Sequence, residues 1–131
     1  MRSRLLAFLG ALALTVGGLL VVSAGPAAAD PAHCSGWNTH PDIYNSGGIS
    51  FQNGTNIRSG PYTDCTVRGD GYPSQGINVH CFVVNANGYV WFYVVDTSTG
   101  VQGWSRIDAL NFSKSVTVPD CYNAASAYQV G

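Results

Sequence analysis

Four cysteines, Cys34, Cys65, Cys81 and Cys121, constrain most strongly how this chain can fold. No two of them are closer than 16 positions, so the chain lacks the Cys-x-x-Cys spacing of structural zinc sites. An even number of cysteines in a short exported chain indicates disulfides, and four cysteines can pair in three ways. The sequence therefore predicts one small domain that two disulfide bonds stabilise.

The N-terminal segment indicates export. Arg2 and Arg4 precede an uncharged, almost wholly apolar run over residues 5–22, and residues 27–29 are alanines. This order of positive, apolar and small residues is typical of a secretory signal peptide. About 18 apolar residues could instead just span a bilayer. The glycines at 17–18 and the lack of a following positive stop signal favour cleavage. We expect residues 1–29 to be removed and the protein to be secreted, without stable membrane insertion.

The charge pattern argues against a nucleic-acid partner. Residues 30–131 contain four basic side chains and seven aspartates, which gives a net charge of −3. A nucleic-acid-binding domain normally carries a stripe of basic residues, and this sequence has none. We expect no nucleic-acid partner and a monomeric protein.

From Ile49 onward, short β-rich runs alternate with turn signals. Asn85-Ala86-Asn87-Gly88 separates two runs of β-branched and aromatic residues, which predicts a hairpin. A second turn is predicted over 96–100, followed by a short strand over 101–107. Helix-forming residues are scarce, so the pattern favours a small all-β barrel or sandwich. Residues 30–49 have no helical period and are interpreted as an extended N-terminal arm.

The period of two assigns side chains to the faces of the predicted strands. It places Ile77, Val79 and Cys81 on the core face, with His80 facing solvent. In the next run, one face carries Val90, Phe92 and Val94, and the other carries Tyr89, Trp91 and Tyr93. The aromatic row has two interpretations. It is either an exposed ligand surface or a second small core beneath the arm, which supplies Trp37, Pro41, Ile43 and Tyr44.

Four segments, in order, carry a family resemblance. They are Asn56-Ile57-Arg58-Ser59-Gly60-Pro61, Gly76-Ile77-Asn78-Val79, Trp91-Phe92-Tyr93-Val94 and Gly103-Trp104. Over about residues 50–112 the chain resembles the bacterial Src homology 3 domain, and it is similar to the disulfide-bearing subset found in secreted proteins of Gram-positive bacteria. It departs at Ser105, where the family usually has valine, and this substitution is expected to weaken the last strand.

The resemblance implies a small, partly open barrel of the Src homology 3 type, flanked by the arm and by a C-terminal tail over 113–131. It also implies a non-catalytic binding module whose partner is a cell-wall glycan or peptide, or a secreted protein. Because the chain is small and predicted to be held by disulfides, a second interpretation is a secreted inhibitor or effector that acts on another protein. In the family layout the segment after Arg-Ser-Gly-Pro runs near the next long strand. The resemblance therefore favours the pairs Cys65–Cys81 and Cys34–Cys121, the latter clipping the tail to the arm.

The candidate ligand-binding residues are an arginine and a set of aromatic side chains. They are Arg58, Tyr62, Tyr89, Trp91, Tyr93 and Trp104. Tyr62 is expected at the tip of the first loop, and Arg58 either binds ligand or supports the turn. No glycine-flanked serine nucleophile or phosphate-binding loop occurs. His40 and Asp42 could be an acid–base pair by residue type, but we do not expect them to be catalytic. We also do not expect His33 beside Cys34 to form a metal site. We expect no enzymatic activity, no cofactor and no bound metal.

Overall fold

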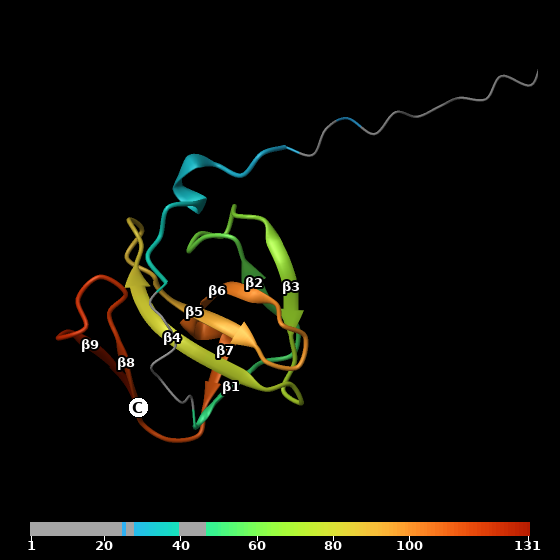
Figure 1. The fold of residues 1–131 in the computed structure, drawn as a ribbon. Helices are drawn as coiled ribbons and strands as arrows, with labels where there is room; N and C mark the ends of the chain where they lie inside the picture. Colours follow the sequence, from blue (N-terminus) through green and yellow to red (C-terminus); the bar gives the residue numbers. More distant parts are fainter. Residues whose placement is uncertain (1–24, 26–27, 40–46) are drawn as a thin grey trace, which may run out of the picture.

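The computed structural model describes residues 25, 28–39 and 47–131, which form an all-β structure (Figure 1). These residues contain nine strands and two short 3₁₀ turns. In chain order the elements are η1 (Ala32–Cys34), β1 (Ile49–Phe51), β2 (Thr55–Arg58), β3 (Val67–Gly71), β4 (Ile77–Val84), β5 (Val90–Asp96), β6 (Gln102–Arg106), η2 (Ile107–Ala109), β7 (Leu110–Phe112), β8 (Val116–Pro119) and β9 (Ala127–Val130).

The strands form three antiparallel sheets that do not close into a barrel. The central sheet has five strands in the order β3-β2-β6-β5-β4, and two-stranded sheets pair β1 with β7 and β8 with β9. The all-β, two-disulfide class expected from the sequence is confirmed. Within the described ranges, no helix is long and apolar enough to cross a membrane.

The hairpin predicted at the Asn-Gly signal is present between β4 and β5. The Asn85 backbone N–H donates to the Tyr89 carbonyl at 2.9 Å, and the Asn85 side-chain oxygen accepts from the N–H groups of Asn87 and Tyr89. Gly88 has a φ of 80°, which most other residues adopt only with strain. The predicted turn over 96–100 is also present and leads into β6.

Each face of the central sheet carries a cluster of buried side chains. On the inner face, the largest side chains of the main core include Phe51, Ile57, Phe92 and Val94, all 0% exposed. On the opposite, outer face a second cluster contains the Cys81–Cys121 disulfide, Val83, Trp91, Tyr93 and Trp104. The alternation predicted for β5 is therefore confirmed, since Phe92 and Trp91 belong to different clusters.

Cys81 lies on the opposite face of β4 from the one that the period of two assigned. The register of β4 against β5 shifts between Val79, opposite Val94, and Cys81, opposite Tyr93. Such a bulge inserts one extra residue, here His80, and reverses the side-chain alternation that follows. Cys81 consequently joins the outer cluster, whereas Val79 stays in the inner core. His80 is half-buried, and its ring lies 5.4 Å from that of Tyr93.

The expected disulfide pairing is wrong. The structure contains Cys34–Cys65 and Cys81–Cys121, with Cα–Cα distances of 5.6 and 4.9 Å. The bulge turns Cys81 towards the C-terminal segment, where the Cys121 N–H donates to the Phe82 carbonyl at 3.0 Å. Both Cα distances lie within the range that a disulfide can span.

The tail is consequently attached to β4, and the arm is attached to the loop after β2. The tail also contributes to the main core, because Val116 and Val118 on β8 are 4% and 0% exposed. Tyr128 on β9 packs against Phe82 with ring centroids 5.4 Å apart. Residues 113–131 therefore complete the inner core, in addition to being held by a disulfide.

Ser105 lies within β6, which forms despite this departure from the family pattern. It is 0% exposed and lies opposite Phe92, on the inner face of the sheet. Its hydroxyl donates to the Asn56 carbonyl at 2.9 Å. A buried hydroxyl with a partner avoids the cost of an unsatisfied polar group, so Ser105 adds a link between β6 and β2.

Candidate functional site

The aromatic row proposed as a ligand surface is mostly buried. Trp91 and Tyr93 are 2% and 9% exposed, whereas Tyr89 is 52% exposed. Trp104, the other aromatic candidate on this face, is 2% exposed. Burial also raises the pKa of the Tyr93 hydroxyl above its usual value. An exposed row of three rings is therefore ruled out.

Trp37 of the arm covers part of the outer face. Its ring lies 6.0 Å from Trp104 in an edge-to-face arrangement and 6.4 Å from Tyr122 of the tail. Its Nε1 donates to the His33 carbonyl at 2.7 Å, which fixes the orientation of the indole. The arrangement agrees with the alternative of a small core under the arm. The other arm residues considered for that role (Pro41, Ile43 and Tyr44), like His40 and Asp42, lie outside the described residues.

Tyr62 is part of the same packing and does not project from the loop. It is half-buried, with its ring 4.4 Å from His33 and 6.2 Å from Trp37. Its hydroxyl accepts a hydrogen bond from the Ala86 N–H at 3.2 Å, which joins the loop after β2 to the β4–β5 turn. These contacts assign Tyr62 a role in holding the arm.

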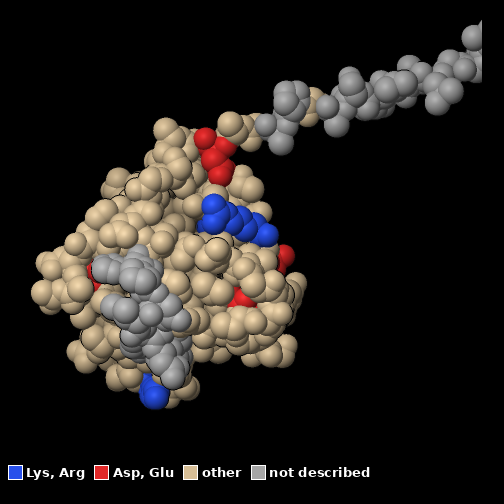
Figure 2. Space-filling model, in the orientation of Figure 1, with Lys and Arg blue, Asp and Glu red and all other residues tan. Residues whose placement is uncertain are grey.

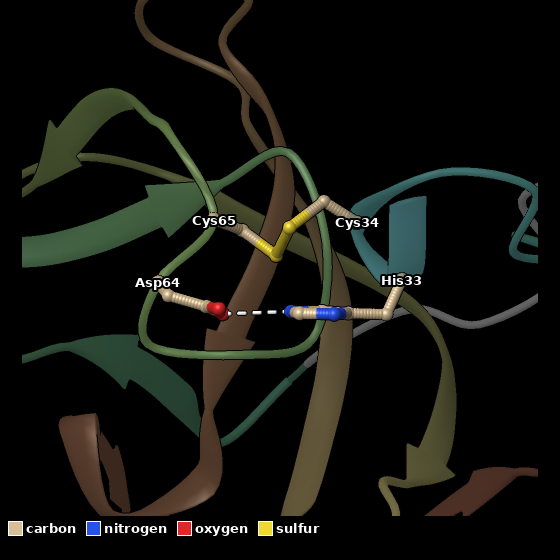
Figure 3. Close-up of side chains that lie close together, drawn as sticks. All are labelled: His33, Cys34, Asp64 and Cys65. Atoms are coloured by element: carbon tan, nitrogen blue, oxygen red, sulfur yellow. Dashed lines mark hydrogen bonds and ion pairs between the residues drawn. A yellow bond between two sulfur atoms is a disulfide. The ribbon is translucent and has the colours of Figure 1, made fainter. Parts of the chain in front are cut away.

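His33, Cys34, Asp64 and Cys65 form a compact cluster where the arm meets the loop after β2 (Figure 3). Their potential ligand atoms lie within 4.8 Å of one another. The two sulfurs are joined in a disulfide, so neither is a thiolate that could ligate zinc. His33 Nε2 instead donates to Asp64 at 2.9 Å, and this hydrogen bond lowers the pKa of the Asp64 carboxyl. The cluster is an attachment point for the arm.

A groove occupies the part of the outer face next to the area that Trp37 covers. It has a volume of about 200 Å³. Most of its lining residues are polar and come from β2, the ends of β5 and β6, and the adjoining loops. They are Gln52, Asn53, Gly54, Thr55, Asn56, Arg58, Thr63, Trp91, Arg106, Asp108 and Ala109.

The register of the central sheet explains why two arginines meet at this groove. Trp91 on β5 lies directly opposite Arg106 on β6, and Trp104 on β6 lies opposite Arg58 on β2. Directly opposed residues of antiparallel strands project to the same face, as do residues two apart on one strand. Arg58 and Arg106 are thus diagonal neighbours, a relationship that separates Cα atoms by about 7–8 Å.

Arg58 is anchored by neutral groups. Its Nη1 donates to the Cys65 carbonyl at 2.9 Å. Its Nη2 donates to the Asn56 side-chain oxygen at 3.1 Å, when the Asn56 amide is oriented to donate to Asp70. No carboxylate of the described residues forms an ion pair with Arg58. Arg58 therefore supports the turn, which was one of the two interpretations proposed from the sequence. Its positive charge at the groove is not balanced by a carboxylate of the described residues.

Arg106 is held in place by Asp108 and Tyr89. Its Nε and Nη2 atoms each donate to Asp108 at 2.6 Å, and its guanidinium lies 4.9 Å from the centre of the Tyr89 ring. The paired hydrogen bonds raise the pKa of Arg106 and lower the pKa of Asp108. Three of its five N–H donors, the two on Nη1 and the second on Nη2, remain for another acceptor.

The indole N–H of Trp91 has no hydrogen-bond partner among the described residues. Trp91 lines the groove, and its Nε1 is buried. A buried donor without an acceptor costs about 1–3 kcal/mol. The Trp91 N–H is thus an unpaired donor among the described residues, and it lies in the same groove as Arg58 and Arg106.

The sequence identified two members of this groove, Arg58 and Trp91, and missed Arg106. The signal for Arg106 was present, because it follows Trp104 by two positions on a predicted strand and therefore shares its face. Of the other candidates, Tyr89 lies at the rim through its contact with Arg106. Tyr62, Tyr93 and Trp104 lie apart from the groove, in the packing beneath the arm.

Comparison with known proteins gives a partial match. The chain is 37% identical over 57 residues to serine/threonine-protein kinase D of Synechocystis sp.. The match covers 44% of this chain and only 11% of the kinase, so it concerns a minor part of that protein. No family model matches the chain, and no solved structure matches it.

Proposed function

We propose that this protein is an exported, non-catalytic binding module that recognises the bacterial cell wall. The signal-peptide pattern at residues 1–29 supports export, and the two disulfides fit an oxidising environment. The resemblance of residues 50–112 to the bacterial Src homology 3 domain supports a binding role, since many members of that family attach to peptidoglycan.

The observation that carries the proposal is the groove with its unused donors. Arg58 has no carboxylate partner among the described residues, Arg106 keeps free N–H groups, and the buried Trp91 N–H has no acceptor. Binding sites typically place a few polar groups against an apolar floor, and these fix the orientation of a ligand. Here the donors project from three adjacent strands of one sheet, which makes the site rigid before a ligand arrives.

The charged groups of the groove support a binding role more than a catalytic one. Among its lining residues the sole carboxylate is Asp108, which is tied to Arg106 and has a lowered pKa. A general acid or base works best with a pKa near the operating pH. A low pKa and a fixed partner make Asp108 a poor proton carrier, which favours binding over chemistry.

The test is co-sedimentation of the exported, oxidised protein with purified Gram-positive cell walls. We expect saturable retention of the protein in the wall pellet. The matched control is the same protein after reduction and alkylation, because it keeps the composition while losing both disulfides. Retention no greater than that of the control would overturn the proposal, and would favour the second interpretation, in which the partner is a secreted protein.

A further inference from the structure

The outer-face groove carries an excess of positive charge in an acidic protein. Its charged lining residues are Arg58, Arg106 and Asp108, a net charge of +1, whereas residues 30–131 together carry −3. On the face shown in Figure 2, basic and acidic side chains lie beside one another near the top, and no basic stripe crosses the surface. A local cationic site on such a background favours a small anionic group over a long polyanion.

The donors in the groove suit a carboxylate. Trp91 contributes one buried N–H that has no acceptor among the described residues, and the two arginines offer further N–H groups from neighbouring strands. A carboxylate has two coplanar oxygens, so one can accept from the indole while the other accepts from a guanidinium. A phosphate monoester would bring about one further negative charge near Asp108, which also lines the groove.

The exposed surface of the groove disfavours a sugar ring. Protein sites bind flat apolar ligand faces largely with exposed aromatic rings, yet Trp91 is only 2% exposed. Tyr89 is exposed, but the Arg106 guanidinium lies over its ring. Asn53 and Thr63, both exposed and polar, line the groove as well and suit a peptide backbone.

We propose that the groove binds the free carboxylate of a short peptide, with Trp91 Nε1, Arg58 and Arg106 as the donors. The inference rests on the proposed function and narrows it, because it assigns recognition to the peptide part of the cell wall rather than to its sugars. The volume of about 200 Å³ is below the range of about 300–1,000 Å³ that encloses drug-sized ligands. The groove therefore takes the end of a peptide and leaves the remainder outside.

The test is an NMR titration of the ¹⁵N-labelled exported protein with N-acetyl-alanyl-alanine and, separately, with its C-terminal amide. The three indole N–H signals are assigned with Trp37→Phe and Trp104→Phe variants. We expect the acid to shift the Trp91 signal saturably and the amide to leave it in place. The Trp37 signal is an internal control, because its N–H already donates to the His33 carbonyl.

Arg58→Gln and Arg106→Gln should each weaken binding of the acid about tenfold or more. Arg68→Gln removes the same charge from β3, outside the groove, and should leave binding within twofold. Equal shifts with the amide, or tighter binding of methyl glucuronide or dimethyl phosphate, would overturn the carboxylate assignment. If the protein is retained by cell walls but the Trp91 signal does not respond to the acid, this inference alone is overturned. If the signal responds but the protein is not retained, the carboxylate site is supported and the wall-binding function is overturned.

Discussion

Trp37 packs edge-on against Trp104, with ring centroids 6.0 Å apart and ring planes at 67°. This contact divides the outer face of the central sheet into a covered part and an open groove. The arm reaches that position because the Cys34–Cys65 disulfide joins it to the loop after β2. The arm is therefore a structural part of the domain.

Replacing Trp37 with alanine should lower the free energy of unfolding by about 1–3 kcal/mol. The loss is smaller than the ~3–5 kcal/mol typical of fully buried aromatic residues because Trp37 is half-buried. Urea denaturation measures it, and iodide quenching should rise as Trp104 becomes accessible. Tyr72→Ala, at a residue that is 42% exposed, should change stability by no more than about 0.5 kcal/mol. An equal loss in both variants would contradict the packing role of Trp37.

A tryptic map under non-reducing conditions should identify the disulfides directly. Cleavage after Arg58, Arg68, Arg106 and Lys114 places each cysteine in a separate peptide. We expect peptide 59–68 to be linked to the peptide containing Cys34, and 69–106 to be linked to 115–131. A species joining 59–68 to 69–106 would instead restore the pairing that the resemblance implied.

Gly60→Ala should destabilise the attachment of the arm. A Cβ at Gly60 would overlap the Cys34 Cα and lie 2.6 Å from its carbonyl oxygen, and neither backbone atom can move aside easily. We expect a lower melting temperature and a Cys34–Cys65 bond that is reduced more readily by dithiothreitol. Gly47→Ala is the matched control, because its nearest neighbour is the end of the Lys114 side chain at 3.5 Å. A Gly60→Ala protein as stable as this control would contradict the close approach.

Acid should loosen the arm. Hydrogen bonds from Ser59 and Thr66 lower the pKa of Asp30 below 3.8, and the bond from His33 does the same for Asp64. A carboxylate with a depressed folded-state pKa contributes stability above its unfolded pKa, and the contribution is lost as the pH falls through the folded pKa. Melting temperatures measured from pH 6 to pH 2 should therefore fall below about pH 4. The fall should be shallower in an Asp30→Asn, Asp64→Asn double variant, and an unchanged profile would contradict these anchors.

The sequence predicted local structure better than long-range contacts. Asn85 and Gly88 specify the hairpin through their own hydrogen bonds and backbone angles. The hairpin could therefore be predicted from the local sequence alone. The bulge at His80 left no comparable signal, and it moved Cys81 to the other face. The predicted disulfide pairing was wrong, including the expected bond between the arm and the tail. Disulfides join cysteines that are distant in the sequence, and the strand pattern does not specify such contacts.

Only some of the groove residues could be predicted from the sequence, because the groove also depends on long-range contacts. Arg58 and Trp91 were selected individually, but their meeting with Arg106 depends on the strand order β2-β6-β5. That order joins strands distant in the sequence, and local patterning does not specify it. The burial of Trp91 and the exposure of Tyr89 likewise depend on tertiary contacts, because β5 is apolar on both faces.

The central claim is that the groove beside the arm is the binding site. Its most direct test is co-sedimentation of the Arg106→Gln and Arg68→Gln proteins with purified cell walls. Each change removes one positive charge, from a partly exposed position at Arg106 and from an exposed position at Arg68. Loss of charge-assisted hydrogen bonds worth about 1.5–3 kcal/mol should weaken retention of Arg106→Gln about tenfold or more. Retention of Arg68→Gln should stay within twofold of the unaltered protein. Equal weakening of the two variants, or none in Arg106→Gln, would contradict the assignment of the groove.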